Sequence, residues 1–328
     1  MLVTVAGCTM SRNLPAERPD GSVAVVLSPS GEYEFFDQGV VWVLDVEGNP
    51  LGEPFVPEEA QIVQVCDASP AGWLLLVLDT DEYGFSVGSR LVEWSPGREA
   101  REIFASPDVL LVPRYAGNGR VLFLRSEEEV AFLWALDGGT GGAVLLESGV
   151  LAFVSTGGRT VVLHADGTVT LLGSGDLPVR ITCGEECAMT FLFLGQVSLA
   201  LDPSGRYLAI VLDEEPAIIQ PDVERLPTLY LVDLLAGSAE RIATPAISPA
   251  FSPDGTKLAF VGQAVDQPDQ EVLVYDVGTG EAAPVAESSG ALWTRWGRAG
   301  LLAGVEGNPT QLVRFAAGRA IDLLPPQR

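Results

Sequence analysis

Short apolar runs separated by turns that contain proline and glycine recur along the whole chain. Residues 25–31 read VVLSPSG, residues 199–205 read LALDPSG and residues 249–255 read PAFSPDG. Proline presets φ for a turn and glycine supplies a positive φ, so the pattern predicts hairpins between apolar strands. A third strand that ends in aspartate and a glycine turn follows in residues 41–48 (VWVLDVEG), 229–237 (LYLVDLLAG) and 272–280 (VLVYDVGTG). A short fourth strand, such as residues 240–243, completes the unit.

Weaker copies of this unit fill the gaps, with turn glycines at positions 72, 119, 158 and 300. With Gly31, Gly205 and Gly255 they make seven markers, spaced from 39 residues (119 to 158) to 50 residues (205 to 255). This is the period of propeller blades, and no capped amphipathic stretch of helix length occurs. A four-stranded blade buries both faces by stacking on its neighbours. We therefore predict an all-β fold, a single seven-bladed β-propeller of four-stranded antiparallel blades, with six or eight blades as the alternatives.

One repeat also resembles a known family. Residues 249–261, followed by residues 272–280, resemble the repeat of TolB-type propellers, a WD-like repeat, and of the propeller domains in prolyl oligopeptidase relatives. The match is close there, good around Gly205 and degraded elsewhere. The resemblance implies a β-propeller that serves as a protein-binding or scaffolding module of the bacterial envelope. Since such propellers have many roles, it implies the fold more strongly than the function.

The first residues have a different character from the repeats. Residues 5–8 (VAGC) match a lipobox, in which the cysteine becomes the lipidated N-terminus of a bacterial lipoprotein. The preceding apolar run is short and lacks a positive region, so an ordinary cysteine in a terminal tail is the alternative. We predict lipidation at Cys8, a tether up to residue 21, the propeller in residues 22–328, and an extracytoplasmic, lipid-anchored protein. No stretch reaches the roughly 18 apolar residues that a membrane helix needs.

The charge of the chain limits its partners. There are 44 acidic and 19 basic residues, a net charge of −25. Such a chain repels phosphates and anionic lipids, which excludes nucleic acid as a ligand and leaves basic partners, metal ions or simple solubility. In a four-stranded meander the connections after the second strands share one face. The acids expected there are Asp79, Asp81 and Glu82; Glu127, Glu128 and Glu129; Asp213, Glu214 and Glu215; and Asp266 and Asp269.

One of these connections, residues 213–227, is long and contains Ile218 and Ile219. Long loops on a rigid scaffold are usually functional or mobile. We predict that the acidic loop face of a monomeric propeller binds a basic protein or peptide. The alternatives are exposed loops that are merely polar, and a long loop that folds back over the rim.

The residues offer little support for catalysis. Residues 84–88 (GFSVG) match the G-x-S-x-G nucleophile elbow, which must join a strand to a helix, but here the pattern predicts a connection between two strands. His164, the single histidine, lies in an apolar strand, where we expect it to be half-buried and hydrogen-bonded. The alternative function is a calcium-dependent hydrolase or lactonase-type enzyme with the metal in the central channel. Only Asp67 and Asp202 fall in the strands that would line that channel, so we expect no cofactor, with calcium as the exception.

The four cysteines are too few for a disulfide scaffold. Cys183 and Cys187 predict a local disulfide across a turn, with two free thiols as the alternative. A zinc site would need further cysteine or histidine partners, which the surrounding sequence lacks. Cys66 lies in an apolar strand, where we expect a buried side chain.

Overall fold

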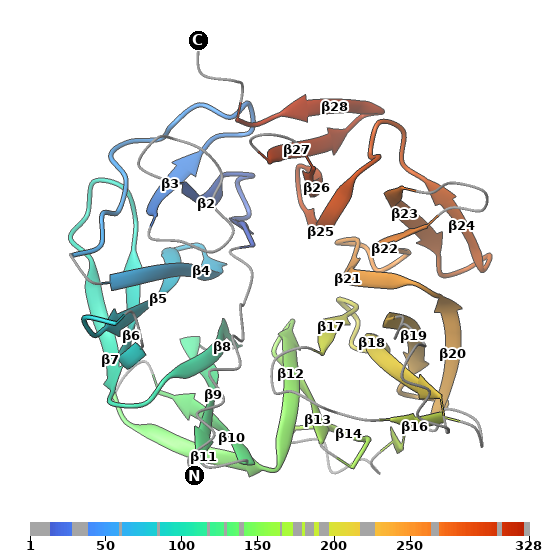
Figure 1. Ribbon diagram of the computed structural model, residues 1–328, viewed down its shortest axis with the longest axis horizontal. Helices are drawn as coiled ribbons and strands as arrows, with labels where there is room; N and C mark the ends of the chain where they lie inside the picture. The colour runs from blue at the N-terminus through green and yellow to red at the C-terminus, as the bar shows by residue number, and fades with distance from the viewer. Residues whose placement is uncertain are drawn as a thin grey trace. The chain divides into compact units, whose positions relative to one another are not determined.

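The computed structural model describes residues 14–27, 39–58, 61–83, 86–116, 119–127, 130–137, 141–164, 166–172, 179–180, 187–189, 197–216, 227–263, 269–306 and 310–324, with the backbone alone at residues 127, 179–180, 187–189 and 213–216. Every element in this part of the chain is a β-strand (Figure 1). The strands form seven antiparallel sheets, the blades of a seven-bladed β-propeller. The predicted fold and blade number are therefore confirmed. None of the described residues forms a helix able to cross a lipid bilayer.

The chain divides into two compact units, and the first contains the first three sheets. Unit 1 consists of Met1–Gly149, Gly307–Leu312 and Ile321–Arg328. Its sheets are β1 (Ala16–Glu17), β2 (Val23–Leu27) and β3 (Val40–Leu44); β4 (Gln61–Ser69), β5 (Gly72–Thr80), β6 (Ser86–Trp94) and β7 (Arg101–Ser106); and β8 (Leu110–Tyr115), β9 (Val121–Glu127), β10 (Val130–Leu136) and β11 (Ala143–Ser148). In the first sheet, single bridges from Pro50 to Leu44 and from Phe55 to Val41 occupy the place of a fourth strand.

Unit 2 consists of Val150–Glu306 and Val313–Ala320. The remaining sheets are β12 (Val150–Thr156), β13 (Arg159–His164), β14 (Thr168–Leu171) and β15 (Val179–Arg180); β17 (Ser198–Leu201), β18 (Tyr207–Pro216), β19 (Pro227–Asp233) and β20 (Ser238–Ala243), with β16 (Cys187–Met189) added to β18; β21 (Ala246–Phe251), β22 (Lys257–Gln263), β23 (Gln270–Asp276) and β24 (Glu281–Pro284); and β25 (Ala291–Gly297), β26 (Gly300–Val305), β27 (Gln311–Ala316) and β28 (Arg319–Asp322). In every sheet, strands that are consecutive in the chain pair side by side, except that β16 pairs with β18 and not with β17.

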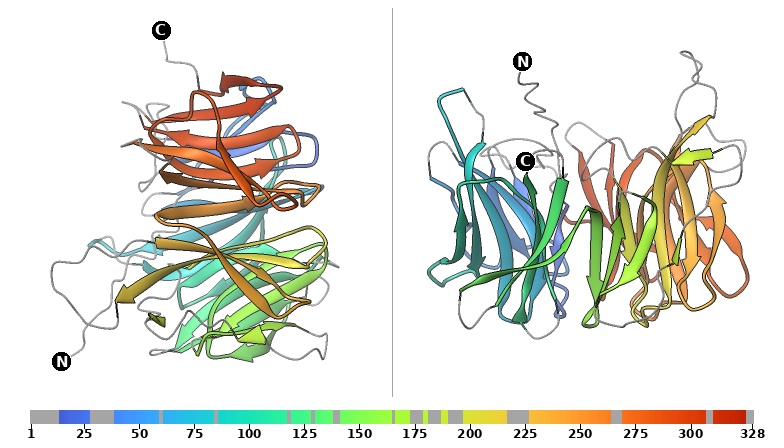
Figure 2. Two further views of the ribbon diagram at one scale, coloured as in Figure 1. Left: turned by 90° about the vertical axis from the view of Figure 1, so that its right-hand side faces the viewer. Right: turned by 90° about the horizontal axis from the view of Figure 1, so that it is seen from below.

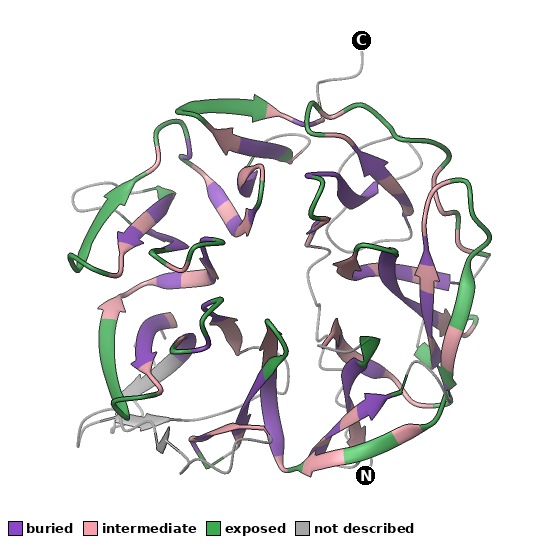
Figure 3. Cartoon of the chain, turned by 180° about the vertical axis from the view of Figure 1, so that it is seen from behind, coloured by how far each residue is buried: buried purple, intermediate pink, exposed green. Residues whose placement is uncertain are grey.

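The middle strands are buried and the outer strands are exposed (Figure 3). In β5, Trp73, Leu74 and Leu75 are at most 1% exposed, because sheets cover both faces of that strand. Leu74 packs in a cluster with Leu110 and Phe123 of the third sheet, whereas Trp73 and Leu75 belong to a cluster shared with the first sheet. The near-continuous apolar runs of the sequence are thus explained by burial on both faces rather than on one.

Arginines also join neighbouring sheets within each unit. In unit 1, Arg18 Nη2 donates to the carbonyl of Pro70, 2.7 Å away, in the β4–β5 turn. In unit 2, Arg159 Nη1 donates to the carbonyl of Ser204, 2.6 Å away, in the β17–β18 turn. Both bonds link the hairpin turn of one sheet to a residue of the preceding sheet. Stacked sheets therefore share polar contacts at their turns as well as an apolar core.

The first repeat differs from the prediction. The turn of its first hairpin lies at residues 18–21, where Gly21 has φ +85°, and not at residues 28–31. Asp20 Oδ1 accepts a bond from Ser22 N at 3.0 Å, just as Asp254 Oδ1 accepts one from Thr256 N at 3.0 Å in the sixth sheet. Residues 28–31 fall between β2 and β3, outside the described residues. The sheet consequently begins at Ala16, inside the segment expected to be a tether.

Candidate partner-binding surface

The described acids predicted for partner binding lie at the ends of second strands or in the connections that lead from them to third strands. In unit 1, Asp79 lies in β5, Asp81 and Glu82 follow it, and Glu127 ends β9. The second and third sheets pack together, so these acids come from neighbouring blades. In unit 2, Asp213, Glu214 and Glu215 lie in β18, and Asp269 immediately precedes β23. Outside the described residues are Glu128, Glu129, Ile218, Ile219 and Asp266.

Several of these acids belong to strands rather than to loops, which corrects the prediction. Asp79 pairs with Gly88, Glu127 with Val130, and Asp213 with Pro227. Glu214 and Glu215 pair in addition with Met189 and Ala188 of β16. Ladder hydrogen bonds join main-chain groups, so pairing continues beyond the last apolar side chain. The hairpins are therefore longer than their apolar runs.

Asp79 is engaged in contacts within its own sheet. Its Oδ1 accepts bonds from Arg90 Nη2 at 2.9 Å and from Gln61 Nε2 at 3.1 Å. Arg90 Nη1 also lies 3.8 Å from Glu102 Oε2. The carboxylate of Asp79 is thus balanced by a cation on the adjacent strand. Of the three acids in this hairpin, Asp79 is the least suited to meet a partner.

The connection between β5 and β6 instead exposes apolar side chains beside its acids. Asp81 Oδ1 accepts a bond from Tyr83 N at 2.9 Å, an Asx turn. The side chain of Tyr83 is 76% exposed and that of Val87 57% exposed, next to the exposed Glu82. This hairpin, drawn in cyan, stands out from the rest of unit 1 in the right-hand view of Figure 2. We call Glu82, Tyr83 and Val87 the hairpin tip.

The sequence interpretation missed the apolar part of this tip. The available signal was an aromatic residue directly after two acids in a short connection (DEYG). In the neighbouring sheet, Val130 is 44% exposed at the start of β10. In unit 2, Asp269 is exposed and its Oδ2 accepts a bond from Ser289 Oγ at 3.2 Å.

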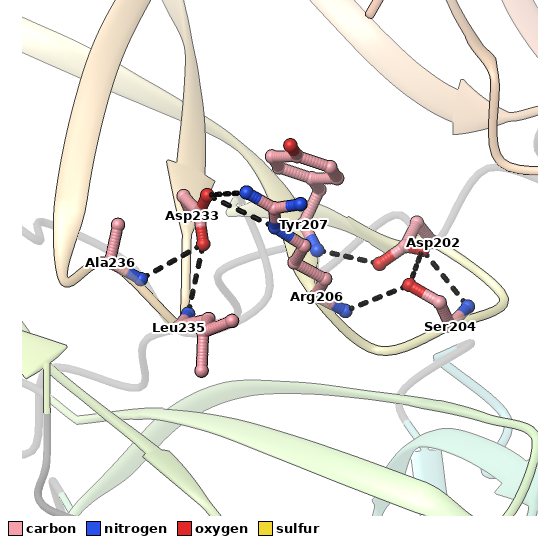
Figure 4. A network of polar contacts seen from close by, with 7 residues as sticks. All are labelled: Asp202, Ser204, Arg206, Tyr207, Asp233, Leu235 and Ala236. Atoms are coloured by element: carbon pink, nitrogen blue, oxygen red, sulfur yellow. Dashed lines mark hydrogen bonds and ion pairs between the residues drawn. The ribbon is translucent and has the colours of Figure 1, made fainter.

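Asp202 and Asp67, the two acids predicted to line the channel, accept hydrogen bonds: those to Asp202 hold a hairpin turn, and one of those to Asp67 joins β4 to β8 of the next sheet. Figure 4 shows Asp202, which is 3% exposed: its Oδ1 accepts Tyr207 N at 2.6 Å, and its Oδ2 accepts Ser204 N at 2.9 Å and the Ser204 hydroxyl. Asp67 accepts bonds from Ala68 N and Tyr115 N, both at 2.8 Å. Within the described residues there is no group of three or more side chains able to hold a metal ion. The observed donors to Asp67 and Asp202 are protein N–H and O–H groups.

Further aspartates stabilise the turns between third and fourth strands. Asp233 Oδ1 accepts bonds from Leu235 N and Ala236 N at 3.0 Å, while its Oδ2 pairs with Arg206 Nη2 at 2.7 Å (Figure 4). The bond from Arg206 is the main cause that lowers the pKa of Asp233. The pKa of Asp276 is also lowered, chiefly by the amide of Thr279. These aspartates therefore have a structural role in the turns that carry them.

The remaining candidate residues can now be placed. Ser86 of the G-x-S-x-G match is the first residue of β6 in a hairpin, which contradicts a nucleophile elbow. His164 ends β13, half-buried, with Nε2 3.1 Å from Thr170 Oγ1, as predicted. Cys66 is buried in β4, as predicted. Cys8 and Cys183 lie outside the described residues, and only the backbone of Cys187 is described. Lipidation and the disulfide therefore stay predictions.

Comparisons with known proteins address the fold. The sequence matches no protein-family model and no curated protein. Among solved structures, the β-propeller domain of the trilobed protease from Pyrococcus furiosus is 11% identical, with a TM-score of 0.61 over 96% of this chain and 100% of that domain. Puromycin hydrolase is 15% identical, with a TM-score of 0.59 over 84% of this chain. TolB from Acinetobacter baumannii is 16% identical, with a TM-score of 0.45 over 93% of this chain and 77% of that one.

These likenesses concern the fold alone. The chain spans 45% of puromycin hydrolase and 34% of the tricorn protease, another similar structure. Propellers of proteases are among the similar structures, which agrees with the propeller fold that the resemblance of residues 249–261 and 272–280 implied. Because identities are at most 16% for these proteins, their activities are not transferred to this chain.

Proposed function

We propose that this protein is a non-catalytic propeller scaffold that binds a basic protein or peptide at the acidic ends of its second strands. The observation that carries the proposal is the hairpin tip, in which the 76% exposed Tyr83 directly follows the exposed Glu82 and Val87 is exposed near the start of β6. Tyrosine is enriched among the residues that dominate binding energy, because it offers a large, rigid apolar surface with a polar end. Exposed carboxylates beside it accelerate encounter with a cationic partner.

The net charge of −25 gives this proposal a second support. A chain of this charge attracts cationic partners over about a Debye length, roughly 8–10 Å at physiological salt. Affinity at the hairpin tip should therefore fall as salt rises. The apolar contact of Tyr83 sets the part of the affinity that salt does not remove.

A panel of fluorescein-labelled peptides, 12 residues long and containing two to four lysines or arginines, provides the probe. Anisotropy titrations of wild type, Tyr83→Ala and Glu82→Gln would be compared with Leu235→Ala and Glu281→Gln. Leu235 is 83% exposed in the β19–β20 turn and Glu281 is exposed in β24, so these controls repeat the same chemistry away from the tip. We expect the two tip variants to weaken binding at least fivefold and the controls to leave it unchanged. Equal losses in tip and control variants, or no binding by any peptide, would refute the proposal.

Calcium provides a test of the alternative function. Since Asp67 and Asp202 accept bonds from main-chain N–H groups, we expect the same melting temperature in calcium and in chelator. A shift of several degrees would favour the calcium-dependent enzyme and count against a scaffold without a metal.

The proposal also includes an extracytoplasmic protein anchored by lipid at Cys8, on the basis of the lipobox-like residues 5–8. Expression in a bacterium fed an alkyne-labelled palmitate should label the wild type, and Cys8→Ser should abolish the label. Unlabelled wild type would remove the anchor from the proposal without affecting the binding surface.

A further inference from the structure

The outer strands of the sheets differ in how they protect their free edges. An outer strand presents unpaired N–H and C=O groups that could pair with another chain, and proteins protect such edges with charges or proline. Four outer strands follow this rule: Arg101 and Glu102 in β7, Glu240 and Arg241 in β20, Glu281 and Pro284 in β24, and Arg319 and Asp322 in β28.

β11 is the outer strand of the third sheet (Figures 1 and 3). It does not follow this rule of edge protection. Its sequence is AVLLES, in which Glu147 is the single ionisable residue. The side chains of Val144 and Leu145 are 59% and 46% exposed. Because they are consecutive in a strand, they point to opposite faces, and both faces of this edge are apolar. Among the described residues, β11 pairs with β10 alone.

The register shows which backbone groups of β11 face outward. Asp137 N donates to Gly142 O at 3.2 Å, so that pair is hydrogen-bonded. Bonded and non-bonded pairs alternate along an antiparallel ladder, and two steps further the Ala135–Val144 pair is bonded. The next pair, Trp134–Leu145, is non-bonded, so the N–H and C=O of Leu145 point away from β10. Within the described part of the chain, Leu145 thus combines an exposed side chain with an N–H and a C=O group that no other strand binds.

We propose that β11 accepts an extended segment of a partner protein as an added antiparallel strand. Backbone bonds to Leu145 would supply affinity, and apolar partner side chains would cover Val144 and Leu145. Glu147 lies at the carboxyl-terminal end of β11, which in an antiparallel pairing adjoins the amino-terminal end of the added strand. The partner segment therefore has apolar residues at its centre and a basic residue near its amino-terminal end.

Charge disfavours a second copy of this chain as the occupant. Two copies would each bring a net charge of −25 to the interface, and a second β11 would bring a second glutamate and no cation. A basic segment complements both the net charge and Glu147. This surface is separate from the hairpin tip, so the inference does not rest on the proposed function.

The test uses two labelled peptides of the same composition. One reads Lys-Lys-Thr-Val-Leu-Val-Thr-Ser and the other carries its two lysines at the carboxyl end, Ser-Thr-Val-Leu-Val-Thr-Lys-Lys. We expect the first to bind the wild type at least fivefold more tightly than the second, and Glu147→Gln to abolish that preference. Leu145→Lys should weaken the first peptide at least tenfold. Ile321→Lys, the same change at a 38% exposed residue of β28, should leave binding unchanged.

Hydrogen exchange distinguishes an added strand from a contact of side chains alone. The bound peptide should slow exchange of the Leu145 amide, which has no partner on β10. Failure of both peptides to bind, equal binding by Leu145→Lys, or an unprotected Leu145 amide would overturn the inference. Sedimentation that showed a dimer dissociated by Leu145→Lys would make a second copy the occupant and would overturn the assignment of a basic partner.

Discussion

Replacing Gly205 by alanine tests whether the turn contact between neighbouring sheets contributes to stability. Gly205 has φ +71° in the β17–β18 turn, and a Cβ there would lie 2.5 Å from Arg159 Cδ and 2.9 Å from Arg159 Nη1. Gly237 has a similar φ of +66°, but a Cβ there meets nothing within 4 Å. Both substitutions therefore cost the free energy of placing an alanine in the left-handed region, but only Gly205→Ala also displaces the Arg159 side chain.

The expected magnitudes follow from these contacts. An alanine in the left-handed region costs about 1–2 kcal/mol, which is the whole expected effect of Gly237→Ala. In Gly205→Ala, the Arg159 side chain must also move and lose its 2.6 Å bond to the carbonyl of Ser204. Since that bond is exposed to solvent, its loss adds about 1 kcal/mol rather than the upper value for charged donors. We expect Gly205→Ala to cost about 2–3 kcal/mol.

Equilibrium urea unfolding followed by tryptophan fluorescence measures these differences, provided that the denaturant dependence stays constant among variants. A double-mutant cycle with Arg159→Ala isolates the contact. In the Arg159→Ala background, Gly205→Ala should cost the same as Gly237→Ala. The reasoning fails if the two alanine variants are equally stable in the wild-type background, or if their difference persists without the arginine.

Two further predictions concern turn aspartates. Asp202→Ala should lower the free energy of unfolding in urea by about 2–4 kcal/mol, since buried donors lose a charged acceptor. Asp202→Ser should cost less, because the serine at the equivalent position of the sixth sheet, Ser252, accepts a bond from Lys257 N at 3.0 Å. Equal costs of the two substitutions would contradict this. Bonds from Ser252 and Thr256 lower the pKa of Asp254 from 3.8 to about 2. A carboxylate whose pKa is lowered by folding stabilises the folded state at pH values above its unfolded-state pKa. This stabilisation is lost as the pH falls through its folded-state pKa. The stability difference between wild type and Asp254→Asn should therefore shrink between pH 4 and 2, and a difference independent of pH would refute the role of the charge.

The fold could be predicted because each repeat combines an apolar strand pair with a turn whose residues restrict φ. The error in the first repeat arose because residues 18–21 (RPDG) and 28–31 (SPSG) both have the chemistry of such a turn. Turn chemistry alone does not say which strands the turn joins. That information lies in the pairing of Ala16 with Ala24, and a two-residue strand is too short to show a period.

The candidate surface was predicted less completely. The positions of the acids at the ends of second strands followed from the meander, but the partnership of Asp79 with Arg90 depends on the register between β5 and β6. The exposure of Tyr83 and Val87 depends on how far this hairpin extends, which its apolar run does not indicate. The apolar edge of β11 depends on its place as an outer strand and on the exposure of Val144 and Leu145, which the apolar run itself does not indicate.

The turn aspartates of this chain keep their negative charge to a lower pH than ordinary aspartates do. Hydrogen-bond donors lower the pKa of Asp20, Asp45, Asp233, Asp254 and Asp276 below the ordinary 3.8; the main donor comes from Arg206 of a neighbouring turn for Asp233 and from the same turn for the other four. These carboxylates stay ionised where free aspartates have begun to take up protons. The groups that shape the loops thus also keep negative charge on the turns at a pH where other aspartates lose theirs. Neutralising these turns requires a lower pH than neutralising an aspartate without such donors, and this is a by-product of how each blade makes its turns.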